Sequence, residues 1–356
     1  SPEKISKQID TVCRLMKLDK SWQSRKLSGG QKQRLITAST LAMGQKIVIL
    51  DEPLANLDTA GAEMLMSTLK SLAKAGYCII VIEHRLDVVL PFVDKVFHVG
   101  NRNVNEITDR ENYLKEQSTE IEDTCSTFSG TLPAFSLADV AFAVKERDIL
   151  NGVTFDILKG SRTVLLGENG CGKTTLLRLI SRLEKPTRGV ILQNIDDKFG
   201  QKSKQSKKWY KKVGVVYQNP DYQLFMQTVE KEIKFGAKSD EYADEIAEKF
   251  GIKHLYARHP QSLSEGQKRR VSIAAVVATD PEVLILDEPT VGQDYKGLCE
   301  MVEVLNKLHE EAHNTMITVT HDKRCAAALC DKSVWIKNGK TYKTGGKELV
   351  DEFFIQ

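Results

Sequence analysis

The chain has 356 residues, a length that predicts about two domains, and its content of 41% hydrophobic and 28% charged residues is typical of a folded globular protein. The formal net charge of +3 is too small to indicate nucleic-acid binding, so we expect no nucleic-acid partner. We expect neither a membrane span, because no apolar run approaches ~18 residues, nor a secretory leader. Seven cysteines form no CxxC pair, which favours reduced thiols and a cytoplasmic location.

The first motif along the chain, Leu-Ser-Gly-Gly-Gln at 27–31, returns as Leu-Ser-Glu-Gly-Gln at 263–267. An apolar stretch that ends in Asp-Glu-Pro follows each motif, and in both copies the serine and the aspartate are 23 positions apart. A predicted strand that ends in histidine comes later in each copy, at His84 and at His321. This agreement in order and spacing predicts a tandem duplication with an offset of 236 positions between Ser28 and Ser264.

The two copies differ in what precedes the shared motifs. A phosphate-loop pattern at 167–174 belongs to the second copy, and an offset of 236 would place its counterpart before the first residue. We therefore expect residues 1–116 to be the C-terminal part of a first domain that lacks its phosphate loop. Residues 117–132 are predicted to be a polar linker, and 133–356 a complete second domain.

Within the second domain, alternating strands at 135–144 and 153–157 predict an antiparallel β layer. A strand at 163–166 and a helix at 175–180 flank the phosphate loop, and the later alternation of apolar strands with helices predicts a parallel α/β core. A lysine-rich stretch at 202–212 has two interpretations, a solvated surface loop, which we favour, or a binding surface for an acidic partner.

The segment 167–174 fits the pattern G-x-x-x-x-G-K-[ST] in the strand–loop–helix setting that this pattern requires. Its backbone N–H groups and the following helix N-terminus favour phosphate, so ATP is the expected ligand. Lys173 is expected to reach the β- and γ-phosphates, and the Thr174 hydroxyl to bind Mg²⁺. The residues predicted to contact the nucleotide are Gly167, Glu168, Asn169, Gly170, Cys171, Gly172, Lys173, Thr174 and Thr175.

Cys171 lies near Lys173 and a helix N-terminus, and both features lower the pKa of a thiol. We therefore expect the site to be sensitive to alkylation. A small residue that simply fits the turn is the preferred interpretation of its presence there.

Asp287 and Glu288 end an apolar strand. Asp287 is predicted to hold Mg²⁺ through a water, and Glu288 to orient the attacking water. An acidic pair at a strand end can instead cap a helix, but downstream of a phosphate loop the catalytic interpretation is favoured. His321 is a candidate contact of the γ-phosphate, because His84 repeats it at the matched position.

The phosphate loop, the two Leu-Ser-x-Gly-Gln signatures, the two Asp-Glu-Pro strands and the two histidines together resemble ABC-type ATPases over nearly the whole chain. Residues 213–225, which contain Gln-Asn-Pro-Asp, are further similar to the glutamine loop of energy-coupling-factor ATPases, which power cobalt and vitamin importers. The resemblance implies P-loop domains with a parallel α/β core, an antiparallel β layer and a helical signature subdomain. It also implies that Gln218 binds Mg²⁺ and senses the γ-phosphate, so that Gln218, Glu288 and His321 form the catalytic set.

The resemblance further implies integral membrane transporter subunits as partners, with the chain bound peripherally to the inner face of the cell membrane. In this family each ATP lies between the phosphate loop of one domain and the signature of an opposing domain, from the same chain or from a homodimer. The first signature would supply Ser28, Gly29, Gly30 and Gln31. In the second, Glu265 replaces a glycine and would bring a carboxylate to the phosphate, so we expect activity to depend more on the first signature.

One position differs from the family pattern, and one short segment has two interpretations. Val144 stands where the family has an aromatic residue that stacks on adenine, and Phe142 is a candidate substitute. Tyr222, Leu224 and Phe225 are expected to form an exposed patch for a membrane partner, with burial in the core as the alternative. An alternative function is that of a cytosolic tandem ABC ATPase acting on ribosomes or nucleic acid, although such proteins usually carry a longer charged linker.

Overall fold

The computed structural model describes residues 2–24, 27, 29–54, 57, 59–100, 102–117, 121, 128–145, 147–195 and 207–355. The chain forms two compact units, Ser1–Thr119 and Glu120–Gln356, and each is described by itself. In these described ranges no helix has both the length and the apolar character needed to cross a bilayer.

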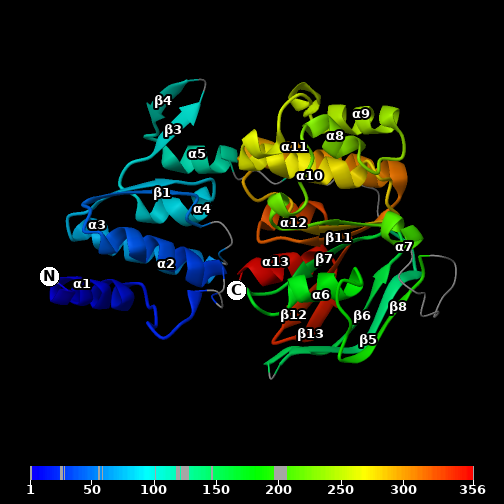
Figure 1. Cartoon of the computed structure of the whole chain (residues 1–356), viewed down its shortest axis with the longest axis horizontal. Helices are drawn as coiled ribbons and strands as arrows, with labels where there is room; N and C mark the ends of the chain where they lie inside the picture. The colour runs from blue at the N-terminus through cyan, green and yellow to red at the C-terminus, as the bar shows by residue number, and fades with distance from the viewer. Residues whose placement is uncertain are drawn as a thin grey trace. The chain divides into compact units, whose positions relative to one another are not determined.

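The first unit is built around two parallel strands, β1 (Ile47–Asp51) and β2 (Cys78–Ile82), paired from Ile47↔Cys78 to Asp51↔Ile82. Side chains alternate along β1, so that Val48 and Leu50 are buried in the core of this unit. The remaining elements of the unit are α1 (Pro2–Leu15), α2 (Gly29–Ala42), α3 (Thr59–Lys74), α4 (Leu86–Val89), η2 (Leu90–Phe92), β3 (Phe97–Gly100), β4 (Asn103–Glu106) and α5 (Arg110–Gln117), all labelled or coloured in Figure 1.

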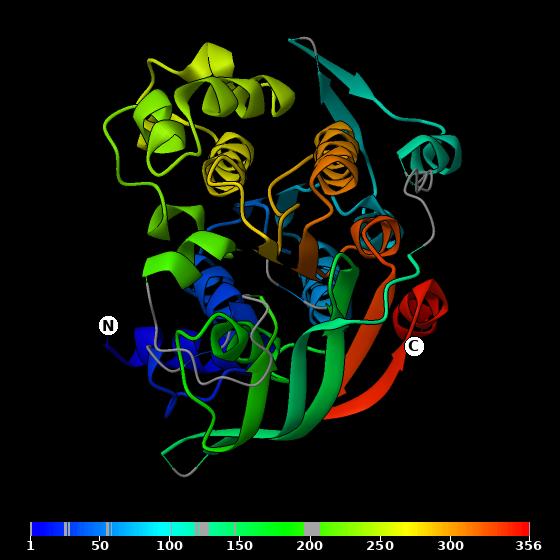
Figure 2. The ribbon, with the colours of Figure 1, turned by 90° about the vertical axis from the view of Figure 1, so that its right-hand side faces the viewer.

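The second unit contains a six-stranded sheet in the order β13-β12-β7-β11-β10-β9, parallel except for the edge strand β13. A three-stranded antiparallel sheet, β6-β5-β8, lies on one side of it, and α8, α9 and α10 lie on the other (Figures 1 and 2). The strands are β5 (Pro133–Val144), β6 (Arg147–Leu158), β7 (Arg162–Leu166), β8 (Arg188–Gln193), β9 (Val213–Val216), β10 (Val283–Asp287), β11 (Thr315–Val319), β12 (Lys332–Lys337) and β13 (Lys340–Gly345).

Several helices of the second unit, although not α6, begin at polar side chains that accept hydrogen bonds from the first turn. Such N-caps are Thr228, Ser239, Ser264, Asp294 and Asp322. The helices and 3₁₀ turns are α6 (Lys173–Ile180), α7 (Lys207–Lys212), η3 (Pro220–Tyr222), α8 (Val229–Lys234), α9 (Asp240–Lys249), η4 (Lys253–Leu255), η5 (Pro260–Ser262), α10 (Glu265–Val277), α11 (Tyr295–Ala312), α12 (Lys323–Ala328) and α13 (Lys347–Ile355).

The central sheet is buried on both faces, which explains why its strands are continuously apolar. Val283 and Ile285 of β10 pack into one cluster with the antiparallel layer and α6. Leu284 and Leu286, which point the other way, pack into a second cluster with the helices. The α/β fold with an antiparallel layer and a helical part, as expected from the sequence, is therefore present.

The antiparallel layer corrects two details of the sequence analysis. The strand predicted at 153–157 is only the end of β6, which starts six residues earlier and pairs with β5 back to Val144↔Arg147. Phe142 is partly buried against the cluster of β5, β6 and α6 and is not among the residues that line the cavity beside the phosphate loop. The structure therefore does not support Phe142 as a substitute for the aromatic residue missing at Val144.

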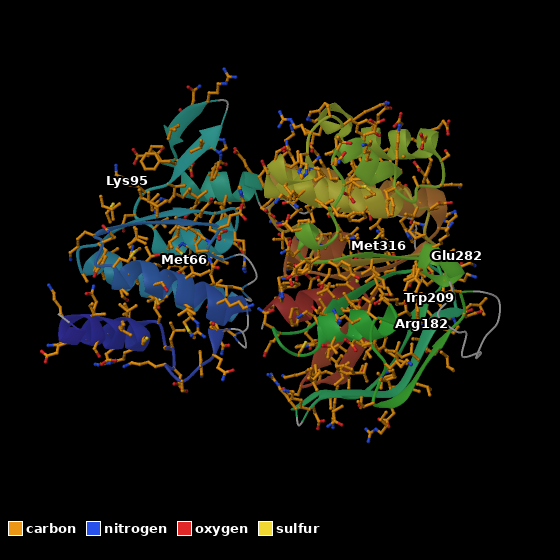
Figure 3. All side chains as sticks on the ribbon, in the orientation of Figure 1. Met66, Lys95, Arg182, Trp209, Glu282 and Met316 are labelled. Carbon is orange, nitrogen blue, oxygen red and sulfur yellow. The ribbon has the colours of Figure 1, made fainter. Side chains whose placement is uncertain are left out.

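The lysine-rich stretch is described only from α7 onward, so Lys202 and Lys204 lie outside the described residues. Lys212 pairs with Glu282 (Nζ–Oε1 2.7 Å). Close to α7, Arg182 lies 4.6 Å from the ring centroid of the buried Trp209, and both residues are labelled in Figure 3. These contacts give the end of the stretch a packing role.

Candidate functional site

The glycine-rich loop at 167–172 connects the buried strand β7 to α6. Gly167, Gly170 and Gly172 have φ values of 151°, 82° and 107°, which favour glycine. A Cβ on Gly172 would lie 2.4 Å from Leu150 Cδ2, so strand β6 also leaves no room for a side chain there. Gly172 is the N-cap of α6 and provides no side-chain cap, which leaves the first N–H groups of this helix available to an anion.

Lys173 is the first residue of α6, and its side chain is buried. The ammonium donates hydrogen bonds to the carbonyl oxygens of Gly167 (2.5 Å) and Glu168 (3.0 Å). The positive charge is therefore held inside the curve of the loop, where it favours a phosphate group.

Asp287 and Glu288 are consecutive at the end of β10, and this strand end lies beside the start of α6. The hydroxyl of Thr174 donates to Asp287 Oδ2 (3.3 Å) across 113 positions of sequence. Burial raises the pKa of Asp287 above its ordinary value, and it raises the pKa of Glu288 to about 8, with the charge of Asp287 adding to the effect. Placing these acids in a buried site is costly without a cation nearby, which agrees with a metal-binding role.

Glu288 is held in an unusual backbone conformation, with φ of 55°. Its N–H donates to the carbonyl of Val319 (2.8 Å), and its carboxylate accepts from the N–H of His321 (3.2 Å). The imidazole Nε2 of His321 lies 3.5 Å from Glu288 Oε1. Glu288 thus has a strained backbone, and both its N–H and its carboxylate form hydrogen bonds. Such strain at the edge of a cleft is typical of a functional position.

These residues line one cavity of about 460 Å³. It contains most of the predicted contacts, although Gly167, Glu168 and Cys171 are not among its lining residues. Four lining residues were not predicted, Arg147, Asp148, Ile149 and Val319; the first three follow the turn after Val144, which is the signal that could have identified them. The complete lining is Val144, Arg147, Asp148, Ile149, Asn169, Gly170, Gly172, Lys173, Thr174, Thr175, Gln218, Asp287, Glu288, Val319 and His321.

The lowered pKa expected for the Cys171 thiol is not found. Burial is the largest influence on this thiol and raises its pKa, outweighing the nearby charge of Lys173, which lowers it. A protonated thiol is a poor nucleophile, so the structure gives no reason to expect unusual alkylation there.

The segment after β9 is tied to α10 by a residue that sequence analysis missed. The buried Arg269 donates from Nη1 to the carbonyl of Tyr217 (2.8 Å) and from Nη2 to the carbonyl of Gln218. Gln223 closes the segment from the other side, because it accepts from the N–H of Tyr217 (2.9 Å) and donates to the carbonyl of Val215 (2.9 Å). The position of Gln218 in the cavity thus depends on the helix that follows the second signature.

The second signature begins α10. Ser264 and Gln267 form a reciprocal capping box at its N-terminus. Glu265 lies 3.5 Å from the ammonium of Lys268, which also pairs with Asp221 at 3.0 Å. In the first signature Ser28 lies outside the described residues, and Gly29, Gly30 and Gln31 form the start of α2.

The first unit repeats the glutamate–histidine arrangement of the second. Glu52 has φ of 44°, its N–H donates to the carbonyl of Ile82 (2.9 Å), and its carboxylate lies 3.6 Å from His84 Nε2. The hydrogen bond from His84 is the largest influence on the pKa of Glu52 and lowers it, whereas burial raises that of Glu288. The two glutamates therefore share a backbone geometry but not an electrostatic environment.

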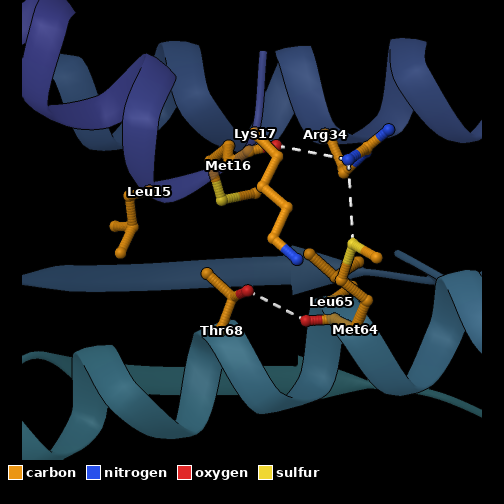
Figure 4. A pocket seen from close by; sticks show the side chains of 7 residues that line it. All are labelled: Leu15, Met16, Lys17, Arg34, Met64, Leu65 and Thr68. Carbon is orange, nitrogen blue, oxygen red and sulfur yellow. Dashed lines mark hydrogen bonds between the residues drawn. The ribbon is translucent and has the colours of Figure 1, made fainter.

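The first unit also encloses a cavity of about 10 Å³ between α1, α2 and α3 (Figure 4). Arg34 crosses it, with Nη1 donating to the carbonyl of Met16 (3.4 Å). A space of this size holds at most one water, so it is a packing defect and not a ligand site.

A glycine-rich loop joins a strand to a helix that begins with Lys-Thr, and a strand that ends in Asp-Glu lies next to them. These elements define a P-loop nucleotide-binding protein. The profile of the ABC transporter family matches residues 3–55 and 150–291. The chain therefore belongs to the ABC transporter family, and it is an ATP-binding and ATP-hydrolysing subunit of a transporter.

Among its relatives is YkoD of Bacillus subtilis, whose name assigns it to HMP/thiamine import as an ATP-binding protein; it is 31% identical over 92% of this chain and 68% of its own length. Among solved structures, cbiO1 of Clostridium perfringens, described as part of the ABC transporter complex cbiONQ, is 32% identical, with a TM-score of 0.55 over 62% of this chain and 92% of its own. A dimeric ATP-binding cassette in a post-hydrolysis state with ADP and Pi is 26% identical, with a TM-score of 0.53 over 60% and 98%.

Proposed function

We propose that the chain is the ATPase subunit of an energy-coupling-factor type importer for a micronutrient or a metal ion. In this proposal ATP binds in the cavity of the second unit, and the energy of binding and hydrolysis is passed to integral membrane subunits. The chain would then lie on the cytoplasmic face of the cell membrane. Residues 1–116 would be part of a first ABC domain, joined by 117–132 to the second domain at 133–356.

The oxygen donors at the end of β10 suit Mg²⁺, which is usually bound by one or two carboxylates together with substrate phosphates. Thr174, Gln218 and Asp287 would hold it, and when bound it would neutralise phosphate charge. Lys173 would bind the β- and γ-phosphates. Glu288, next to Asp287 and beside His321, would orient the attacking water and accept its proton once bound Mg²⁺ favours the charged form of the carboxylate, with His321 as a γ-phosphate contact.

One observation carries the transport proposal: exposed aromatic side chains lie four and seven positions after Gln218, at Tyr222 and Phe225. The side chains of Tyr222 and Phe225 are 79% and 66% exposed, and Phe235 packs edge-to-face against Phe225 at 5.3 Å. We call Tyr222, Phe225 and Phe235 the aromatic patch. Leu224 does not belong to it, because its side chain is buried in the helical cluster and anchors the segment.

Hydrogen bonds connect the aromatic patch to the cavity, which favours a role for the patch in coupling ATP hydrolysis to transport. Gln218 lines the cavity, and Arg269 holds the carbonyls of Tyr217 and Gln218. Gln223, the residue after Tyr222, bonds back to Tyr217 and Val215, which ties the patch to the start of the same segment. A change at the nucleotide can therefore move an exposed apolar surface, the kind of surface that binds a protein partner. The names of YkoD and cbiO1 support an importer as that partner.

The experiment replaces both Tyr222 and Phe225 by serine in the full chain, in the cells that produce it. We expect the variant to leave the membrane fraction while keeping its affinity for ATP, because the changed side chains do not line the cavity. The readouts are membrane fractionation and ATP titration.

Ile355→Ser is the matched control, because it removes an apolar side chain that is 78% exposed outside the patch. This control should remain with the membrane. Co-purification of ribosomes or nucleic acid with the wild-type chain, and of no integral membrane protein, would instead favour the cytosolic tandem ATPase.

A further inference from the structure

A buried arginine of α10 holds the backbone next to the cavity without lining the cavity itself. Arg269 is 2% exposed, and its guanidinium donates from Nη1 to the carbonyl of Tyr217 (2.8 Å) and from Nη2 to the carbonyl of Gln218. Two consecutive carbonyls are thus held by one planar group, which can form both bonds at once. The backbone from which the Gln218 side chain enters the cavity is therefore fixed from α10.

The stability of α10 does not explain this arginine. Burial lowers the pKa of its guanidinium, and the negative charges of Glu288 and Asp287 oppose this effect. Among the residues that the structure describes, the buried Nε of Arg269 has no hydrogen-bond partner. A buried charge and an unpaired buried N–H both weaken a fold. The two carboxylates that compensate line the cavity, which indicates that Arg269 serves the site.

The duplicated sequence provides an internal comparison. The offset of 236 positions places Arg269 opposite Gln33 and Arg270 opposite Arg34. The second arginine is thus present in both copies, and in the second unit it points to α11, where it pairs with Glu300 (2.8 Å). Only the residue that contacts Gln218 differs between the two helices, and the arginine occurs in the copy that carries the phosphate loop.

We propose that Arg269 is a positioning residue that sets Gln218 for Mg²⁺-ATP. This inference rests on the proposed binding of Mg²⁺-ATP in the cavity and on the proposed role of Gln218. A metal ligand must be held within a fraction of an ångström, and the groups that orient it matter nearly as much as the ligand itself. Loss of Arg269 should therefore weaken the binding of Mg²⁺-ATP and spare that of metal-free ATP.

The test measures the dissociation constant of ATP for the full chain, once with EDTA and once with Mg²⁺. We call the ratio of the two constants the Mg²⁺ factor. Gln218→Ala should lower the Mg²⁺ factor about tenfold, and Arg269→Gln, which introduces the residue of the first copy, should lower it by about as much. The affinity for ATP in EDTA should stay within about twofold of the wild type in both variants, because neither change removes a phosphate contact.

The double variant of Gln218→Ala and Arg269→Gln distinguishes positioning from an independent effect. If Arg269 acts through Gln218, the double variant has the same Mg²⁺ factor as Gln218→Ala alone. A further loss of about tenfold in the double variant would overturn the proposal. A wild-type Mg²⁺ factor in Arg269→Gln would overturn it as well.

Arg269→Lys keeps the charge near the carboxylates and provides the test if the neutral variant does not fold. One ammonium cannot reproduce the planar fork that holds two carbonyls, so the Mg²⁺ factor should fall at least about threefold. A wild-type factor in Arg269→Lys would show that the charge alone matters and would contradict the positioning role.

Arg270→Gln is the matched control, because it removes the neighbouring arginine of the same helix, which pairs with Glu300. It should keep the wild-type Mg²⁺ factor, and a loss equal to that of Arg269→Gln would show a general loosening of α10 and overturn the proposal. Lys173→Ala separates this inference from the proposed function. If it leaves the affinity for ATP unchanged, the cavity is not the triphosphate site and the proposed function fails too.

Discussion

Glu52 and Glu288 have the same local geometry, and their surroundings differ. Both have positive φ, both donate a backbone N–H to the strand beside them, and both face a histidine. The side chain of Glu288 is 7% exposed, and that of Glu52 is 34% exposed. Removal of water from a carboxylate disfavours its charged form, and at Glu288 this effect is the largest and raises the pKa, with the charge of Asp287 adding to it. At Glu52 the hydrogen bond from His84 outweighs burial and lowers the pKa.

Glu288→Gln should keep ATP bound and stop its turnover. The amide has nearly the same shape as the carboxylate but cannot accept the proton of the attacking water, so we expect hydrolysis to fall at least a hundredfold, the scale of a lost general base. ATP titration and phosphate release are the two measurements. Wild-type turnover in this variant would move the catalytic role elsewhere, with His321 as the next candidate.

The raised pKa of Glu288 also predicts how stability depends on pH when no nucleotide or Mg²⁺ is added. Between its ordinary value near 4.5 and about 8, the folded chain keeps a proton that the unfolded chain has lost, so stability falls as pH rises through this window. Glu288→Gln cannot titrate, and its melting temperature should decline less than that of the wild type from pH 5 to pH 8. Glu52→Gln is the control and should follow the wild type over this range; parallel curves for Glu288→Gln would contradict the assigned shift.

At the scale of elements, a buried ion pair joins the start of β7 to the residue before β12. Arg162 Nη2 lies 2.6 Å from Asp331 Oδ1, and the Arg162 backbone N–H donates to Asp331 Oδ2 at 2.7 Å. The guanidinium also donates to Asn306 of α11 (2.9 Å) and to the carbonyl of Ala328 (3.1 Å). One arginine thereby fixes two helices against the strand that leads into the phosphate loop.

Asp331→Ala should lower the free energy of unfolding by about 3–5 kcal/mol, because it leaves a buried guanidinium without its counter-charge. Urea denaturation of the second unit within the full chain is the measurement. The control is Glu303→Ala, which breaks an ion pair with Lys307 in which both side chains are 61% exposed; it should cost less than about 0.5 kcal/mol. Equal effects in the two variants would show that the buried pair contributes no more than a surface pair.

At the scale of the whole molecule, the question is which signature supports hydrolysis. We expect activity to depend more on Ser28 and Gly30 than on Ser264, because Glu265 would bring a carboxylate to the γ-phosphate. The measurement is ATP hydrolysis by Ser28→Arg and by Ser264→Arg in the full chain.

The signature experiment needs a stability control, because Ser264 also caps α10. Its replacement removes a cap worth about 1 kcal/mol, so the melting temperature must be compared as well. If Ser264→Arg abolishes hydrolysis in a folded protein while Ser28→Arg does not, the prediction is wrong and second domains of two chains pair with each other.

The local motifs were accessible from sequence, since each depends on residues a few positions apart. The phosphate loop and the Asp-Glu strand end occur at the predicted residues, because the φ requirements of a tight turn and the apolar pattern of a strand are properties of short segments. The repeated spacing also predicted that both copies would carry the Asp-Glu motif and the strand-end histidine, and the structure adds that Glu52 lies beside His84 and Glu288 beside His321.

Only the tertiary structure decided burial and the contacts between distant segments. The strands β1 and β10 have similar apolar sequences, but their side chains are buried to different extents. Ile47 and Ile49 of β1 are more than half exposed, whereas Val283 and Ile285 of β10 are buried. The reason is that, among the described residues, β10 is paired with a strand on each side and covered by a β layer, and β1 is not. Tyr222 and Leu224 are two residues apart, yet only Tyr222 is exposed. Arg269 reaches the carbonyl of Gln218 across 51 positions, and strand β6 closes over Gly172. A linear pattern records neighbours along the chain, whereas solvent exclusion and pKa shifts depend on what the fold packs against each side chain.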